Sequence, residues 1–209
     1  MKKKTRILIV DDHFTARVGL RVPLDAEPDL EVVAEAQNAA EAFTLFAQHR
    51  PDVVILDYKL PDLSGVQALE KLRLDFPDAR VLMLTVFDGE EDIHRAILAG
   101  ATGYLTKSAG LRDLLGAVRA VAKGEKHFPP EIAAKIKARD QREPLIPREE
   151  EILRHLVRGR SNKEIADAMR LSLGTIALHV SKILDKLGAA DRTRAATLAI
   201  ERGIVRLGE

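Results

Sequence analysis

Apolar residues in the first part of the chain gather in short continuous runs, separated by longer segments in which they recur at helical spacing. The runs cover residues 5–10, 31–36, 53–57, 80–85 and 103–106. Runs of this length are typical of strands buried on both faces of a parallel sheet. The helical segments cover residues 14–26, 39–49, 66–75, 90–99 and 111–122. This alternation predicts an α/β fold, with a doubly wound five-stranded parallel sheet between two layers of helices.

Two residues bear on the limits of these helices. Pro23 lies inside the first helical segment, where a proline costs about 3 kcal/mol or forces a kink. The sequence leaves two alternatives open: the helix bends at Pro23, or it ends early. Asn38 is the expected N-cap of the second helix, because its side chain can accept a hydrogen bond from the first turn.

The second part of the chain lacks any strand pattern. Pro129 and Pro130 open a short charged helix, and further prolines at positions 144 and 147 indicate a linker. Four helical segments follow at 148–158, 162–169, 173–187 and 192–202, with Ser161, Ser172 and Asp191 as expected caps. We predict a first domain at 1–124, a linker at 125–143 and a small all-α domain at 144–209.

Composition and charge narrow the classes of function. The chain has no cysteine, which excludes a disulfide scaffold, a thiolate zinc site and a cysteine nucleophile. The apolar run at 7–10 behind the basic start is too short for a signal-peptide core or a membrane span, so we expect a cytoplasmic protein. Residues 144–209 carry 12 Lys and Arg against 9 Asp and Glu. The smaller predicted domain is therefore basic, which points to a polyanionic partner.

Chemically active side chains stand where four of the predicted strands end. They are Asp11 with Asp12, Asp57, Thr85 and Lys107. The carboxyl ends of parallel strands meet at one edge of such a sheet, where ligands bind. Three carboxylates there repel one another, and a hard cation such as Mg²⁺ removes that cost. The hydroxyl and the ammonium group complete a cradle for a phosphoryl group, and Asp57 is the expected nucleophile that forms an acyl phosphate.

Each of these residues alone has an ordinary explanation. An Asp-Asp pair after a strand is usually a cap or a solvated turn, and a lysine such as Lys107 is usually solvated. Their joint placement at four strand ends favours the phosphoryl site.

These segments resemble the receiver domain of bacterial two-component response regulators. The similar motifs are Ile-Val-Asp-Asp-His at 9–13, Ile-Leu-Asp-Tyr-Lys-Leu-Pro-Asp-Leu-Ser-Gly at 55–65, Leu-Thr-Val-Phe-Asp at 84–88 and Gly-Tyr-Leu-Thr-Lys-Ser at 103–108. The resemblance spans residues 5–123 and implies a flavodoxin-like fold. It also implies that Asp57 accepts a phosphoryl group from a histidine kinase.

The resemblance assigns roles to further residues. Asp12 and Asp57 are the implied ligands of Mg²⁺, with Asp11 acting nearby through water and the Lys59 carbonyl as another ligand. The implied switch is formed by Thr85, which moves onto the phosphoryl group, and Tyr104, which repacks inward. The residue pattern alone assigns Tyr104 to the core.

Two other residues stand apart from these roles. His13 is common at this position in one receiver subfamily, and we assign it no part in phosphotransfer. Pro23 departs from the family, whose first helix is unbroken and often contributes to dimer contacts.

A helix-turn-helix is predicted within the basic domain. The helix at 162–169 leads through a tight connection at 171–174 into a second helix, which in this arrangement enters the major groove of DNA. The core face of the second helix comprises Ile176, Val180, Ile183, Leu184 and Leu187. The residues left outside are Thr175, Ala177, Leu178, Ser181, Lys182 and Asp185. Periodicity alone favours a small helical bundle for protein contacts.

The amino-acid sequence of this segment resembles a LuxR-type DNA-binding domain. The similar motifs are Ile-Pro-Arg-Glu at 146–149, Ser-Asn-Lys-Glu-Ile-Ala at 161–166, Gly-Thr-Ile-Ala-Leu-His-Val-Ser-Lys-Ile-Leu-Asp-Lys-Leu-Gly at 174–188 and Asp-Arg-Thr-Arg-Ala-Ala at 191–196. Together with the receiver, the match at about 144–207 is typical of the NarL/FixJ class. The predicted contacts with double-stranded DNA are Lys163, Thr175, Ala177, Leu178, Ser181 and Lys182.

Three positions depart from the LuxR-type pattern. Ala177 stands where family members usually carry lysine, so the salt dependence of DNA binding should be flatter by about one unit of slope. Leu178 replaces a threonine, asparagine or valine and is able to touch a thymine methyl group. Ile146 replaces a common capping threonine, which weakens the start of the first helix of the domain.

The sequence thus predicts a transcription regulator that is not a turnover enzyme. Phosphorylation of Asp57, followed by dephosphorylation, would alter dimerisation and DNA binding. One alternative is a phosphatase of the haloacid-dehalogenase type, but that class needs a second acid two residues after the nucleophile, and Lys59 stands there. The other alternative is a regulator whose basic domain docks onto proteins.

Overall fold

The computed structural model describes residues 3–206. Within this range the chain forms two compact units, one of residues up to 87 together with 93–133, the other of residues 88–92 together with 134 onward. No helix among the described residues combines the length and the apolar character that crossing a membrane requires.

The first unit contains a parallel sheet in the strand order β2-β1-β3-β4-β5. The strands are β1 (Thr5–Val10), β2 (Leu30–Ala36), β3 (Val53–Leu56), β4 (Val81–Thr85) and β5 (Gly103–Thr106). β3 and β4 are buried along their whole length, as their continuous apolar runs predict. The predicted doubly wound, five-stranded parallel sheet is confirmed.

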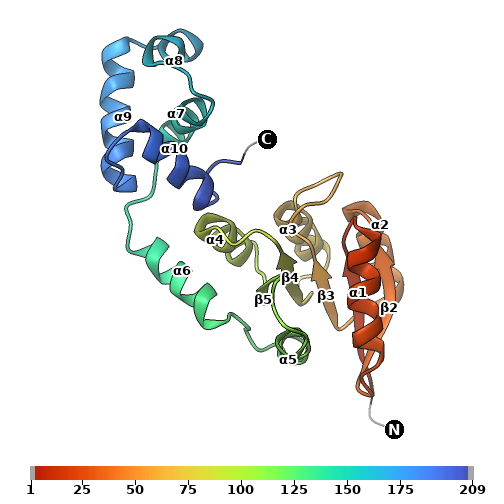
Figure 1. Cartoon of the computed structure of the whole chain (residues 1–209). Helices are drawn as coiled ribbons and strands as arrows, with labels where there is room; N and C mark the ends of the chain where they lie inside the picture. The colour runs from red at the N-terminus through yellow and green to blue at the C-terminus, as the bar shows by residue number, and fades with distance from the viewer. Residues whose placement is uncertain (1–2, 207–209) are drawn as a thin grey trace. The chain divides into compact units, whose positions relative to one another are not determined.

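Five helices connect and cover this sheet: α1 (Phe14–Asp25), α2 (Ala39–His49), α3 (Gly65–Asp75), α4 (Glu90–Leu98) and α5 (Leu111–Ala122). From β1 the chain crosses to β2 at one edge of the sheet. It then returns past β1 to β3 and continues through β4 to β5 at the opposite edge. Because such crossovers are right-handed, α1 lies on one face of the sheet and α2, α3 and α4 lie on the other (Figure 1). α5 joins α1, and Leu24, Val118 and Val121 pack there against the strands.

α1 continues through Pro23 and ends at Asp25. Pro23 stands in the last turn, so the helix loses only the hydrogen bond that would reach the carbonyl of Gly19. The alternative in which the helix ends early is wrong. Asn38 caps α2 as predicted, and its side chain accepts a hydrogen bond from the Glu41 N–H at 2.8 Å.

Five further helices follow along the described residues: α6 (Pro130–Asp140), α7 (Pro147–Val157), α8 (Asn162–Met169), α9 (Leu173–Leu187) and α10 (Arg192–Glu201). The predicted caps are confirmed, because the side chains of Ser161, Ser172 and Asp191 each accept an N–H from the following turn. α7 to α10 enclose one apolar core that includes Ile152, Ile165 and Ile183. The predicted domain limits stay a prediction.

Ile146 makes no side-chain cap for α7, as expected from the loss of a threonine there. Two other features support this helix start. Pro147 occupies a first-turn position that suits proline, and the Ile146 N–H donates to the Glu149 carboxylate at 3.1 Å.

Candidate functional site

The candidate site lies where the order of the strands reverses. β1 and β3 are neighbours, but the chain leaves them towards opposite faces of the sheet. Ligands of open α/β sheets bind beyond the carboxyl ends of the strands at such a point. Asp11 and Asp12 follow β1, and Asp57 follows β3.

Lys107 connects the carboxylates of two strands. It follows β5, and its ammonium Nζ lies 2.7 Å from Asp11 Oδ2 and 2.7 Å from Asp57 Oδ2. Asp11 is only 2% exposed and Asp57 only 5% exposed. The structure therefore brings together the ends of β1, β3 and β5, as the sequence predicts.

Backbone N–H groups hold the other carboxylate oxygens. Asp57 Oδ1 accepts a hydrogen bond from the Tyr58 N–H at 2.7 Å, and Asp11 Oδ1 accepts one from the His13 N–H at 2.8 Å. Each buried carboxylate thus has one oxygen fixed by the backbone and the other bound to Lys107.

Burial and charge shift the pKa values of this cluster. Burial raises the pKa of Asp57, and Asp11 adds to this, while Lys107 opposes it; the net shift is upward. Burial lowers the pKa of Lys107, but the two carboxylates outweigh it and the net shift is again upward. Lys107 therefore stays protonated at neutral pH and compensates only part of the negative charge, which leaves the cluster attractive to a further cation.

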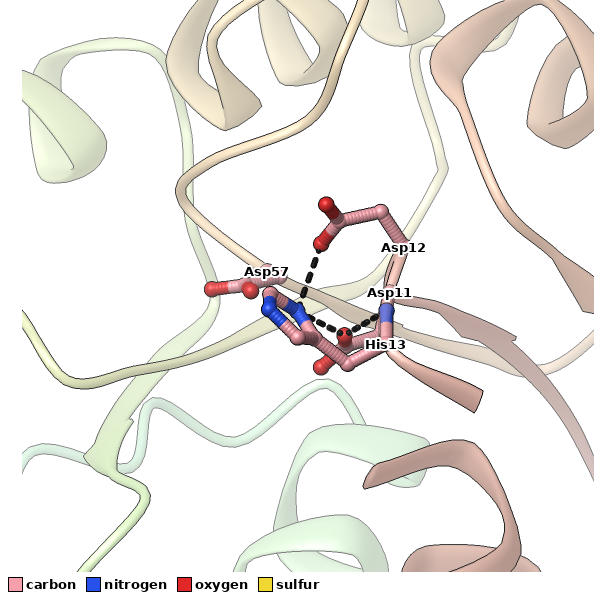
Figure 2. Close-up of side chains that lie close together, drawn as sticks. All are labelled: Asp11, Asp12, His13 and Asp57. Atoms are coloured by element: carbon pink, nitrogen blue, oxygen red, sulfur yellow. Dashed lines mark hydrogen bonds and ion pairs between the residues drawn. The ribbon is translucent and has the colours of Figure 1, made fainter. Parts of the chain in front are cut away.

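Asp12 and His13 lie beside Asp11 and Asp57, and together these four residues offer oxygen and nitrogen atoms that could bind a metal ion (Figure 2). Ligand atoms of Asp11, Asp12, His13 and Asp57 all lie within 4.8 Å of one another. The His13 Nδ1 atom is 2.7 Å from Asp12 Oδ1 and 3.3 Å from Asp11 Oδ1. The sequence assigns His13 no part in phosphotransfer, and the structure places it among the acids. A set dominated by carboxylates fits Mg²⁺, which prefers one or two of them together with water.

Thr85 and Tyr104 are both completely buried. The Thr85 Oγ1 atom accepts a hydrogen bond from the Phe87 N–H at 3.1 Å. The Tyr104 hydroxyl donates to the Phe87 carbonyl at 2.7 Å, and the Phe87 ring meets the Tyr58 ring edge-on at 5.5 Å. The two residues of the predicted switch thus bind the same loop residue, which also touches the neighbour of Asp57.

Tyr104 lies inward in this structure, as its residue pattern alone predicts.

Lys59 is exposed, and its backbone pairs with that of Ser64 across the loop that follows β3.

Arg17 is a supporting residue that the sequence analysis missed. It belongs to α1 but is buried. Its Nη1 donates to the Asp11 carbonyl at 2.8 Å, and its Nε donates to Glu35 at 3.3 Å. The sequence did offer a signal for this role, because Arg17 stands at a helical position that faces the core. A charged side chain that is buried needs specific binding partners. Arg17 fixes the backbone that presents Asp11.

Asp62 is a second missed residue. Its carboxylate accepts hydrogen bonds from the N–H groups of Ala39 and Ala40 at 3.0 and 3.1 Å. Burial raises the pKa of Asp62, but these and other backbone hydrogen bonds outweigh it and lower the pKa overall. Asp62 therefore ties the loop after Asp57 to the start of α2, a contact between distant segments that the local sequence does not reveal.

Gly65 lets α3 begin directly beside Asp57. Its N–H donates to the Tyr58 carbonyl at 2.6 Å, and an added Cβ would stand 2.2 Å from the Asp57 carbonyl oxygen. Backbone atoms cannot move aside as a flexible side chain can. Only glycine fits without displacing the backbone at Asp57.

Replacing Gly65 with alanine is expected to lower the free energy of unfolding by about 1–3 kcal/mol, as overpacking does. Gly19→Ala is the matched control. It changes an interior position of α1 where an added Cβ meets nothing within 4 Å, and it should raise stability by up to about 1 kcal/mol. Urea unfolding of both variants measures the difference, and equal effects would contradict the close approach at Gly65.

The helix-turn-helix consists of α8 and α9. Lys163, Ala177, Leu178, Ser181 and Lys182 are exposed, as predicted for residues that contact DNA. Thr175 is only half-exposed, and its Oγ1 lies 2.8 Å from Ser172 Oγ at the cap of α9. Five of the six predicted contact residues are thus accessible, while the Thr175 hydroxyl serves the start of the helix.

Comparisons with known proteins match both parts of the chain. Residues 7–119 match the response regulator receiver domain, and residues 143–199 match the bacterial regulatory proteins of the luxR family. The response regulator protein VraR of Staphylococcus aureus is 36% identical over 205 residues, covering 96% of this chain and 98% of that protein.

Two solved structures extend the comparison. The response regulator ChrA of a heme-sensing two-component system is 36% identical with a TM-score of 0.57, over 97% of this chain and 99% of that one. The RcsB–DNA complex is 24% identical with a TM-score of 0.74, over 94% of this chain and 98% of that one, which supports the fold alone.

Proposed function

This chain belongs to the response regulators of two-component systems, with a receiver domain and a LuxR-type DNA-binding domain, and we propose that phosphorylation of Asp57 by a histidine kinase controls its dimerisation and its binding to DNA. The observation that carries this proposal is the contact of Lys107 with both Asp11 and Asp57 at 2.7 Å. It joins the proposed nucleophile, the proposed cation site and the proposed phosphate-binding ammonium group in one place.

The two carboxylate oxygens of Asp57 have different partners. Oδ1 is held by the Tyr58 N–H, and Oδ2 lies against Lys107. In the transfer, a bond forms between a carboxylate oxygen of Asp57 and phosphorus, while the bond between phosphorus and the donor histidine nitrogen breaks. The Lys107 ammonium can then compensate charge on the phosphoryl oxygens.

The acids beside Asp57 would hold the metal cofactor. Asp12 and Asp57 are the proposed ligands of Mg²⁺, with Asp11 acting through water and the Lys59 carbonyl as a further ligand. Bound Mg²⁺ supplies compensation for the charge that develops on phosphoryl oxygens.

We propose that Thr85 and Tyr104 transmit the change. If Thr85 turns its hydroxyl towards the phosphoryl group, it gives up the hydrogen bond from the Phe87 N–H. The Phe87 carbonyl is the acceptor of the Tyr104 hydroxyl, so both ends of this loop residue respond together. This shared contact supports a switch with two arrangements rather than a gradual adjustment.

The basic domain would carry the output. Dimers on two half-sites are proposed, with α9 in the major groove. A solved structure of RcsB is described as two dimers bound to two parallel DNAs. No catalysis is proposed beyond phosphorylation and dephosphorylation of Asp57. The expected cytoplasmic location stays a prediction.

Incubation with acetyl phosphate and Mg²⁺ tests the proposed chemistry. We expect one phosphoryl group per chain, labile to hydroxylamine as an acyl phosphate is, and located by peptide mapping on Asp57. A stable label on another residue, or no label, would refute the assignment of the site.

Ala177→Lys tests the predicted weakness of phosphate contacts. The added cation is expected to steepen the plot of log affinity against log salt concentration by about one unit. Leu74→Lys adds the same charge on α3 of the receiver and should leave the slope unchanged. DNA titrations at several salt concentrations measure both slopes, and equal slopes would mean that position 177 does not approach the duplex.

A further inference from the structure

The first two turns of α9 expose aliphatic side chains. Leu173 is 56% exposed and Leu178 is 58% exposed, and Ala177 beside them is also exposed. Positions 173 and 177 are one turn apart, as are 174 and 178, so all of them share one face of the helix. Gly174 adds no side chain to this methyl face, which we define as Leu173, Ala177 and Leu178.

Polar groups of the same turns do not reach this face. The Thr175 hydroxyl is engaged with Ser172 at the helix start, Ile176 is buried, and Val180 packs on the core. His179 is half-buried, with its Nδ1 atom enclosed. Within residues 173–180, the exposed side chains are therefore Leu173, Ala177 and Leu178, and none of them forms hydrogen bonds.

Exposed cations belong to the same helix-turn-helix as the methyl face. Lys163 on α8 and Lys182, one turn beyond Leu178 on α9, are both exposed. An apolar strip with a cation one turn beyond it suits the major groove of duplex DNA, where phosphates border the base edges. A docking surface for an apolar protein segment would not require that arrangement of charge.

The apolar feature of the major groove is the C5-methyl group of thymine. We propose that Leu178, assisted by Ala177, selects the operator by packing against thymine methyl groups. The half-site then carries thymine where a lysine at position 177 would favour guanine, the base that lysine reads best. This inference rests on the proposed function and adds the chemistry of base selection.

The test uses the full chain with beryllofluoride and Mg²⁺. DNA duplexes that the protein retains from a random-sequence pool are sequenced. Each thymine of the selected half-site is then replaced, one at a time, by deoxyuridine, which lacks only the methyl group. Loss of one buried methyl is expected to weaken binding about fourfold at one or two positions. In Leu178→Ala, thymine and uracil duplexes should bind equally at those positions. Leu74→Ala, which removes a leucine that is 80% exposed on α3, should keep the fourfold difference.

The outcomes separate this inference from the proposed function. Retained duplexes without any uracil effect, or with an effect that persists in Leu178→Ala, would overturn base selection by Leu178 and leave DNA binding intact. If no duplex is retained, the proposed DNA-binding function fails, and base selection fails with it.

Discussion

Asp57→Asn is expected to abolish phosphorylation by acetyl phosphate and, with it, every change in dimerisation and DNA affinity that acetyl phosphate causes. The physical reason is that an amide nitrogen cannot replace the carboxylate oxygen that attacks phosphorus. The exchange keeps the size of the side chain, and its remaining oxygen can still accept the Tyr58 N–H that Asp57 Oδ1 now accepts at 2.7 Å. The loss is therefore chemical rather than structural. Phosphoryl incorporation and light scattering measure it.

Asp75→Asn is the matched control for this experiment. Asp75 ends α3 and is exposed, so its replacement should leave phosphorylation and the response to acetyl phosphate unchanged. Phosphorylation of Asp57→Asn at the rate of this control would contradict the identity of the nucleophile.

Lys107→Met is expected to lower the free energy of unfolding by about 3 kcal/mol at neutral pH without added metal. The substitution keeps most of the length of the side chain and removes the ammonium group, which leaves Asp11 and Asp57 buried without their cation. Removing one member of a buried ion pair costs several kcal/mol because the remaining charge is uncompensated. Chemical unfolding in the presence of a chelator measures the loss.

The pH dependence of this loss has a defined sign. The pKa of Asp57 is already raised in the folded protein, and loss of Lys107 raises it further because Lys107 opposes that shift. A carboxyl group whose folded pKa exceeds its unfolded pKa destabilises the fold as pH rises through that window. The deficit of Lys107→Met should therefore be largest at neutral pH and should shrink towards pH 4.

Added metal provides a second check on the same variant. Added Mg²⁺ should raise the free energy of unfolding more in Lys107→Met than in the original chain. In the variant, the metal ion is the only cation that compensates the charge of Asp11 and Asp57. A deficit that is independent of both pH and Mg²⁺ would mean that Lys107 contributes packing rather than charge.

The sequence predicts the receiver well because its signals are local. A buried strand followed by an acid, as at Asp57, fixes both the strand and the position of its end. The carboxyl ends of the strands of a doubly wound parallel sheet lie at one edge, so Asp11, Asp57 and Lys107 can be placed there from the sequence alone.

The supporting contacts could not be predicted in this way. Arg17 reaches the Asp11 carbonyl from α1, and Asp62 reaches the start of α2. Both depend on how packed elements bring distant backbone groups together. Thr175 shows a similar limit, because its helical position points outward while its hydroxyl is engaged at the cap.

Pro23 illustrates a choice that local energetics leave open. A proline is costly in the interior of a helix and nearly free in its first turn. In the last turn of α1 it removes a single hydrogen bond, and Leu24 next to it is completely buried. Burial of that side chain holds the final turn in place against the loss.

The most direct test of the switch is the affinity of the full chain for duplex DNA with and without beryllofluoride plus Mg²⁺, measured by fluorescence anisotropy at two salt concentrations. If phosphorylation of Asp57 controls the output, the phosphate mimic will tighten salt-sensitive binding in the original chain and will have no effect in Asp57→Asn. Equal affinities with and without the mimic in the original chain would contradict the account.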